Sequence, residues 1–187
     1  MRLRRWAIAF AVAGLCVMGV TGTASAEPSD GPVVPPTAGP TAKIDPQFPG
    51  SWPRYRWHSA VGWLMMDVRL GGGHGAQVQL YGDNGTDPQL WVAEHAAEGG
   101  DFLHPGYNRW LCLDFNGERR AGAPILVNNC DGSDSQRWYY FGNGPGYALS
   151  SHSDYAFCID VPGSNFSLEQ PLQLWNCNNT AAQRWTL

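Results

Sequence analysis

The sequence predicts an all-β fold built from three related copies of one unit, and two repeated patterns carry this prediction. The tripeptide Gln-x-Trp begins at Gln89, Gln136 and Gln183, so successive copies are 47 residues apart. A second pattern lies upstream of each copy and ends in an aspartate. Its three aspartates are Asp67, Asp114 and Asp160. A fixed period of this size is typical of a repeat architecture, in which each repeat is one supersecondary unit.

The first 26 residues are predicted to be a secretory signal peptide. Three arginines lie within the first five residues, an apolar run covers 6–20, and small residues occupy 24–26. This order of basic, apolar and small residues is the pattern of an export signal. The apolar run is shorter than the about 20 residues of a membrane span. We therefore expect a secreted, extracellular protein with no membrane partner.

Residues 27–53 are predicted to form an extended linker, because their eight prolines and few large apolar side chains cannot bury a core. The remainder, 54–187, has the size of one domain. Removal of 1–26 leaves 9 basic side chains against 16 acidic ones, and lysine contributes only Lys43. Such a chain has no basic stripe for phosphates, so a nucleic acid partner is not expected.

Each copy contains four short β-type runs separated by Gly, Asn, Asp and Pro. The expected strands are 55–58, 63–68, 76–81 and 89–93 in copy one, 102–104, 110–115, 125–127 and 136–141 in copy two, and 147–149, 157–161, 172–175 and 183–187 in copy three. No run has the length and period of a helix. Twelve short strands in three pseudo-symmetric repeats predict a β-trefoil, since a closed barrel leaves no unpaired strand edge.

Four cysteines follow the predicted signal peptide, and an even number in an exported chain predicts disulfides. Three pairings are formally possible. Copies two and three each hold one cysteine at the start of the aspartate motif and another 18 or 19 residues later. The repeat therefore favours Cys112–Cys130 and Cys158–Cys177. The CxxC spacing of zinc sites is absent, so neither a metal nor a cofactor is expected.

Three motifs together resemble the ricin B-type lectin family, the carbohydrate-binding β-trefoils with three Gln-x-Trp repeats. They are the Cys-Leu-Asp opening, the Gln-Leu-Trp-x-Cys middle and the Gln-x-Trp close, and the resemblance covers nearly all of 54–187. It implies a non-catalytic, lectin-like module that binds oligo- or polysaccharides of galactose or xylose type. We expect it to act as a monomer.

The resemblance also implies which residues contact saccharide: the motif aspartate, a glutamine and an aromatic residue two apart in the middle strand, and a closing Asn-Gln pair. An aromatic face covers the C–H side of a sugar ring, while carboxylate and amide groups satisfy its hydroxyls. The predicted saccharide-binding residues are Asp160, Gln173, Trp175 and Gln183 in copy three, and Asp67, Gln79, Tyr81 and Gln89 in copy one. The residues before the closing glutamines are Pro88, Ser135 and Ala182, so no copy has the expected asparagine.

Copy two is expected to be silent, because Leu126 and Asn128 stand where the middle glutamine and aromatic residue should be. Replacement of Asn128 should then have no effect.

Several motif residues also have a structural interpretation. The tryptophans of the Gln-x-Trp motifs are predicted to fill the barrel core, since three symmetric large apolar side chains suit a shared interior. The glutamines beside them could bond turn backbone instead of ligand, and the aspartates could cap turns. Trp175 and Tyr81 are predicted to lie at the surface and contact ligand.

An enzyme is not expected, because the three aspartates belong to separate repeats and cannot form the close carboxylate pair of a glycosidase. The histidines show no metal-binding spacing. A β-trefoil that binds protein, such as a protease inhibitor acting through exposed loops, stays as the alternative, since fold does not fix function. Its candidate loops are 94–100 and 142–146.

Overall fold

The computed structural model describes residues 48–115 and 117–187. The predicted signal peptide and the greater part of the predicted linker, 27–47, lie outside these residues. Within the described ranges, no helix has the length and apolar character needed to cross a membrane.

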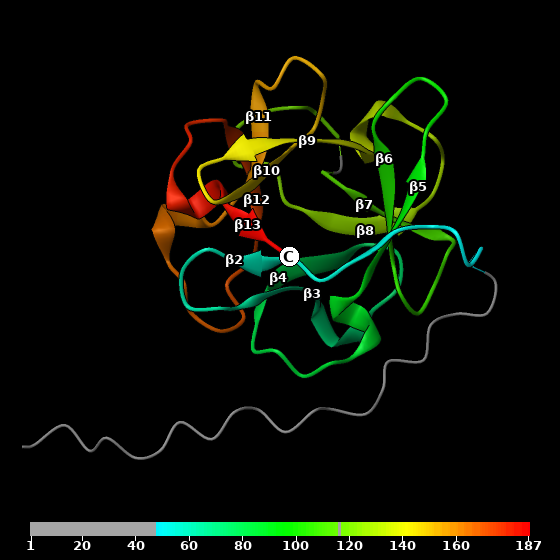
Figure 1. The fold of residues 1–187 in the computed structure, drawn as a ribbon, viewed down its shortest axis with the longest axis horizontal. Helices are drawn as coiled ribbons and strands as arrows, with labels where there is room; N and C mark the ends of the chain where they lie inside the picture. The colour runs from blue at the N-terminus through cyan, green and yellow to red at the C-terminus, as the bar shows by residue number, and fades with distance from the viewer. Residues whose placement is uncertain (1–47, 116) are drawn as a thin grey trace, which may run out of the picture. The chain divides into compact units, whose positions relative to one another are not determined.

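The described residues form thirteen short strands and five single-turn 3-10 helices (Figure 1). The strands are β1 (Arg54–Tyr55), β2 (His58–Ser59), β3 (Met65–Val68), β4 (Ala76–Tyr81), β5 (Trp91–His95), β6 (Asp101–Pro105), β7 (Leu111–Asp114), β8 (Leu126–Asn129), β9 (Arg137–Asn143), β10 (Gly146–Ser150), β11 (Phe157–Asp160), β12 (Gln173–Asn176) and β13 (Trp185–Thr186). The 3-10 helices are η1 (Arg69–Gly71), η2 (Asp87–Gln89), η3 (Asp134–Gln136), η4 (Pro162–Ser164) and η5 (Ala181–Gln183). The all-β trefoil prediction is confirmed.

Strands β1, β5, β6, β9, β10, β13 and β2 pair in that order, and every pair is antiparallel. Because β1 and β2 are successive pieces of one segment, the ring closes on itself. In Figure 1, β13 and the C-terminus lie beside β2 at this closure. The ring thus has no free edge, as the repeat predicted.

Two details of the expected strands are wrong. The single strand expected at 55–58 is interrupted at Arg56-Trp57, since β1 pairs with β5 whereas β2 pairs with β13. The three Gln-x-Trp glutamines do not begin strands. Each ends a 3-10 helix, and its tryptophan lies two residues further on in the chain.

A hairpin stands on each repeat, formed by β3–β4, β7–β8 and β11–β12. The loop of each hairpin bonds to the next repeat: Gly75 N–H to Val127 O, Gly122 N–H to Leu174 O, and Glu169 N–H to Leu80 O. Loops of repeats one, two and three therefore lie against repeats two, three and one. This cyclic arrangement joins the repeats outside the ring.

The three Gln-x-Trp tryptophans are completely buried, which confirms their predicted place in the core. Each indole N–H donates to the carbonyl just before a motif aspartate: Trp91 to Met66, Trp138 to Leu113 and Trp185 to Ile159, over 3.0, 2.9 and 3.4 Å. A buried N–H needs such a partner. The two repeated sequence patterns are thus joined, in each repeat, by the same hydrogen bond between the indole and the strand of the aspartate.

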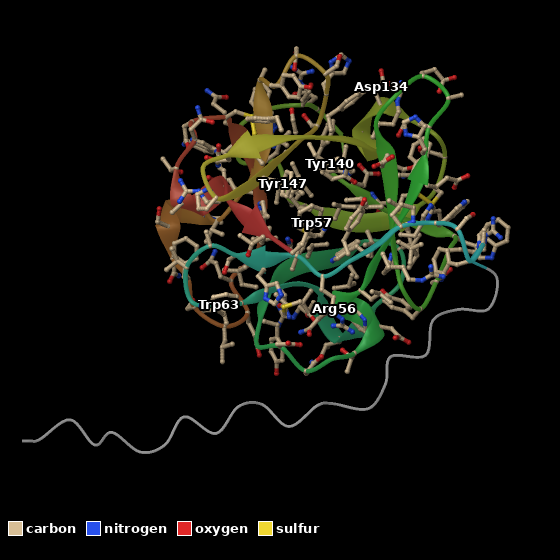
Figure 2. The ribbon with its side chains drawn as sticks, viewed as in Figure 1. Arg56, Trp57, Trp63, Asp134, Tyr140 and Tyr147 are labelled. Carbon is tan, nitrogen blue, oxygen red and sulfur yellow. A yellow bond between two sulfur atoms is a disulfide. The ribbon has the colours of Figure 1, made fainter. Side chains whose placement is uncertain are left out.

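A second aromatic group lies around Trp57, where repeats one, two and three meet. The Trp57 ring stacks on Tyr140 at 5.7 Å and meets Tyr147 edge-on at 6.1 Å, and Figure 2 shows these three side chains close together. Such ring pairs are favourable beyond their buried area. Trp57 thus contributes core packing at the position where the first strand is interrupted.

Both predicted disulfides, Cys112–Cys130 and Cys158–Cys177, are present. Each joins the first strand of a hairpin to the segment after the second strand. Residues 48–53, assigned by sequence to the linker, lie against repeat two. Phe48 is buried, and the Trp52 ring stacks on His104 at 5.6 Å.

Candidate functional site

Repeat three carries an open cavity of about 420 Å³ beside the β11–β12 hairpin. Asp160 and Gln173 are opposite one another in register, and Trp175 follows two residues later on β12. Because side chains alternate along a strand, Gln173 and Trp175 share one face. Trp175 is 41% exposed. The structure therefore brings three of the four predicted residues of this repeat to the cavity.

Repeat one carries a related cavity of about 310 Å³. Asp67 faces Gln79 across β3–β4, and Tyr81 lies on the same face, 36% exposed. The positions equal those of repeat three, with tyrosine in place of tryptophan. Here too, three of the four predicted residues line the cavity.

In both cavities, a hydrogen bond from the glutamine amide fixes the orientation of the aspartate carboxylate. Gln79 Nε2 donates to Asp67 Oδ1 over 3.1 Å, and Gln173 Nε2 donates to Asp160 Oδ1 over 2.8 Å. An ionised carboxylate can accept further bonds, since it has about four lone-pair sites. Each aspartate can therefore accept from a ligand hydroxyl while the glutamine fixes its orientation.

Burial raises the pKa of both site aspartates above the ordinary value. Hydrogen bonds from Gln79 and Gln89 partly offset this for Asp67, as bonds from Gln173 and Gln183 do for Asp160. Desolvation disfavours the charged form, whereas donors favour it. The amides thus help to keep each carboxylate ionised inside a partly buried cavity.

The structure places Gln89 and Gln183, the two remaining predicted saccharide contacts, away from the cavities. Both side chains are completely inaccessible to solvent, and neither lines a cavity. Gln183 Nε2 donates to Asp160 Oδ2 and to Asn176 O over 3.2 and 2.9 Å, while its Oε1 accepts from Asn178 N–H over 2.8 Å. Gln183 therefore holds the aspartate and the loop that follows β12 in place.

Gln89 makes the corresponding loop bonds in repeat one. It accepts from Asn84 N–H over 3.0 Å and donates to Gly82 O over 2.8 Å. The structural interpretation of these glutamines, left open by the sequence, is the one that their burial supports.

Among the cavity residues that the sequence reasoning missed, two polar residues recur in both cavities. Asn84 and Thr86 line the cavity of repeat one, and Asn178 and Thr180 line that of repeat three. In both, the asparagine Oδ1 accepts from the threonine N–H and hydroxyl, at 3.0 and 2.6 Å in repeat one and 3.1 and 2.7 Å in repeat three. The repeated Asn-x-Thr was the signal that could have found them.

Repeat two uses its aspartate differently. Gln136 Nε2 and Asn128 Nδ2 both donate to Asp114 Oδ2, over 3.0 and 3.2 Å. Asn128 Oδ1 also accepts from the backbone N–H of Gly75, in the loop that arrives from repeat one. Asn128 therefore ties two repeats together, so its replacement should lower stability, while the absence of an effect on saccharide binding stays a prediction. Leu126, opposite Asp114, offers no polar group.

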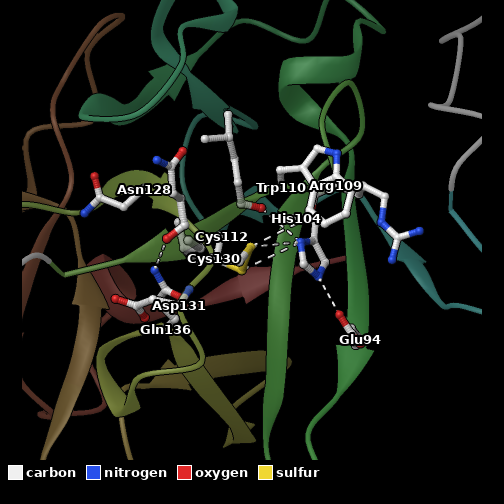
Figure 3. The surroundings of a disulfide bond; sticks show 12 residues. Glu94, His104, Arg109, Trp110, Cys112, Asn128, Cys130, Asp131 and Gln136 are labelled. Carbon is white, nitrogen blue, oxygen red and sulfur yellow. Dashed lines mark hydrogen bonds and ion pairs between the residues drawn. A yellow bond between two sulfur atoms is a disulfide. The ribbon is translucent and has the colours of Figure 1, made fainter.

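The Cys112–Cys130 disulfide lies beside the buried His104 (Figure 3). His104 Nδ1 is 2.9 Å from Leu111 O, and Nε2 is 3.2 Å from a Glu94 carboxylate oxygen. Burial lowers the pKa of His104. Nδ1 and the two sulfurs lie close enough to share a metal ion. Cysteine binds metal as a thiolate, however, and these sulfurs are bonded to each other, so the group serves structure.

The two loops of the alternative function are hairpin connections in the ring. Residues 94–100 include the end of β5 and the β5–β6 turn, in which Gly99 N–H donates to Ala96 O. Residues 142–146 include the β9–β10 turn, in which Asn143 pairs with Gly146. Arg184 Nε donates to Asn143 O over 2.9 Å. The Tyr139 hydroxyl donates to Gly99 O over 3.2 Å. Side-chain bonds thus hold both loops against the ring.

With the fold and cavities described, comparison with known proteins decides the family. Residues 61–185 match the family model of the ricin-type β-trefoil lectin domain. The chain belongs to this family. It therefore carries a carbohydrate-binding module. No curated protein sequence matches the chain significantly.

Solved structures agree with the fold of this ricin-type lectin. The designed threefold-symmetric protein ThreeFoil has a TM-score of 0.66 at 22% identity, covering 71% of this chain and 96% of its own. The Rhizoctonia solani agglutinin gives 0.65 at 20%, covering 74% and 97%. The Macrolepiota procera ricin B-like lectin, solved in complex with lactose, gives 0.60 at 14%, covering 72% and 93%. At these identities the likeness concerns the fold alone.

Proposed function

We propose that this chain is a secreted, non-catalytic lectin that binds saccharide through the cavities of repeats three and one. The observation that carries the proposal is the repetition of one Asp–Gln–aromatic arrangement in two of three otherwise similar repeats. Repeat two keeps the aspartate and the buried glutamine of the Gln-x-Trp motif, but it has Leu126 and Asn128 in place of the middle-strand glutamine and aromatic residue. A purely structural role would not require exposed aromatic side chains at the same two places.

The chemistry of each cavity suits a neutral sugar ring. The exposed face of Trp175 or Tyr81 can cover the apolar C–H side of the ring. The aspartate opposite can accept from two ring hydroxyls, and the neighbouring glutamine fixes that carboxylate. Both cavities are open, which fits a monosaccharide affinity of about millimolar, roughly −4 kcal/mol. Two such sites on one monomeric body raise the avidity for a polysaccharide.

A galactose- or xylose-type sugar is the class that we propose. The structurally similar Macrolepiota procera lectin was solved with lactose, a galactose-containing disaccharide. No step of bond cleavage is proposed, because Asp67 and Asp160 belong to separate cavities and cannot act on one glycosidic bond as a carboxylate pair.

The test uses the secreted chain without residues 1–26, applied to a glycan array and then titrated with the saccharides retained. Trp175→Ala should abolish most binding at repeat three, and Tyr81→Ala most binding at repeat one, with unfolding temperatures unchanged. Trp110→Ala is the matched control, because Trp110 is 64% exposed yet lines neither cavity.

Retention that survives the combined Trp175 and Tyr81 changes would place saccharide elsewhere on the protein. An array without signal, together with inhibition of a secreted protease, would favour the protein-binding alternative.

A further inference from the structure

The two cavities match closely on the hairpin side but differ in the turn that follows the aspartate. Gln79, Asn84 and Thr86 have direct equivalents in Gln173, Asn178 and Thr180. In the turn, by contrast, Leu70 of η1 lines the repeat-one cavity where Gly163 of η4 lines the other. The turn therefore adds an apolar side chain to the lining of the repeat-one cavity and none to that of repeat three.

Leu70 has an unusual backbone conformation and an unusually exposed side chain. Its backbone φ is +56°, in the left-handed region that favours glycine, and its side chain is 95% exposed. Gly163 has nearly the same conformation, with a φ of +59°. A leucine here is disfavoured by its backbone and buries almost nothing in the fold. Such local strain occurs preferentially at functional sites.

The surroundings of Leu70 add to the contrast between the cavities. Glu169, from the hairpin loop of repeat three, also lines the repeat-one cavity and lies 3.9 Å from Arg69. Backbone bonds fix its position, since Glu169 N–H donates to Leu80 O over 2.8 Å. Gln79 Oε1 is buried without a hydrogen-bond partner among the described residues. The repeat-one cavity thus combines an apolar side chain with polar groups that are already positioned.

We propose that the repeat-one cavity selects a saccharide unit carrying a methyl-bearing substituent, which packs against Leu70, whereas repeat three does not make this distinction. The methyl can belong to an N-acetyl group or to a 6-deoxy carbon. This inference rests on the proposed saccharide binding at repeat one. Burial of one methyl group corresponds to a gain in affinity of about fourfold.

The experiment isolates repeat one by using Trp175→Ala as the parent protein. Glucose, galactose and mannose are titrated by NMR beside their N-acetylated and 6-deoxy counterparts, so that the two sources of the methyl are separate arms. At least one methyl-bearing sugar should bind about fourfold more tightly than its parent hexose. Leu70→Gly in the same background should reduce this ratio to about one while leaving the affinity for the parent hexose within about twofold.

Leu70→Gly does not endanger the fold, because glycine adopts a positive φ without strain. Leu168→Ala is the matched control, since Leu168 is an exposed leucine of the neighbouring loop that does not line the cavity. The reciprocal change, Gly163→Leu in a Tyr81→Ala background, should install the preference in repeat three, where a Cβ at 163 would meet nothing within 4 Å.

A preference that persists in Leu70→Gly, or its absence from the parent protein, overturns the inference while leaving saccharide binding at repeat one intact. Failure of the Trp175→Ala protein to bind any saccharide refutes the repeat-one site itself, and the inference with it.

Discussion

Replacement of Gln183 by alanine tests whether this residue braces the repeat-three site or contacts saccharide. Its buried amide makes three hydrogen bonds, to Asp160, Asn176 and Asn178. A buried hydrogen bond contributes about 1 kcal/mol on balance, so their loss should lower the free energy of unfolding by about 3 kcal/mol. For a domain of this size that corresponds to a fall of about 10 °C in unfolding temperature.

Gln136→Ala is the matched control, since Gln136 makes the same three types of bond to Asp114, Asn129 and Asp131. Calorimetry should show a similar loss of stability for both variants. Saccharide titration, followed through the NMR signal of the Trp175 indole, should show weakened binding only for Gln183→Ala, because repeat two has no exposed aromatic platform.

Two results would refute this reasoning. Loss of saccharide binding in Gln183→Ala without loss of stability would make Gln183 a ligand contact. Loss of saccharide binding in Gln136→Ala would make repeat two a binding site.

Three further outcomes are expected. Because burial raises the pKa of Asp67 and Asp160 and their ionised forms accept sugar hydroxyls, saccharide affinity should fall as the pH is lowered, with a midpoint above that of an ordinary aspartate. A flat titration profile would count against these contacts. Replacement of Cys158 and Cys177 by alanine should lower the free energy of unfolding by about 3 kcal/mol in a urea titration; an unchanged midpoint would contradict the loop-closure estimate. Asn128→Ala should lower the free energy of unfolding by about 1–2 kcal/mol and leave saccharide binding unaltered. An unchanged stability in calorimetry would contradict the inference that Asn128 joins two repeats.

The fold was predictable because its repeated sequence patterns are also its repeated contacts. Trp91, Trp138 and Trp185 recur at one period since each fills the core and bonds the strand that carries a motif aspartate. The disulfides followed from the same symmetry. The interruption of the first strand at Trp57 could not be foreseen, because it results from pairing with two strands far away in the sequence.

Only the site residues that lie on the hairpin strands could be predicted from the sequence. Register places Gln173 opposite Asp160, and strand alternation then puts Trp175 on the same face, so a local pattern was sufficient. Burial of Gln183 has no such local pattern, because it depends on the loop that folds over it. The entry of Glu169 into the cavity of repeat one depends on contacts between distant repeats, which a single sequence does not reveal.

The cyclic contact of hairpin loops makes the repeat-one cavity the property of two neighbouring repeats, because Glu169 of repeat three lines it. A symmetric protein assembled from three copies of repeat one would keep Asp67, Gln79 and Tyr81 in every unit. Each unit would, however, receive the His74–Gly75 loop that now lies against repeat two, in place of the loop carrying Glu169. Its three pockets would therefore differ from the natural one. Repeat one of this lectin can therefore be duplicated as a unit of folding, but not, by itself, as a unit of recognition.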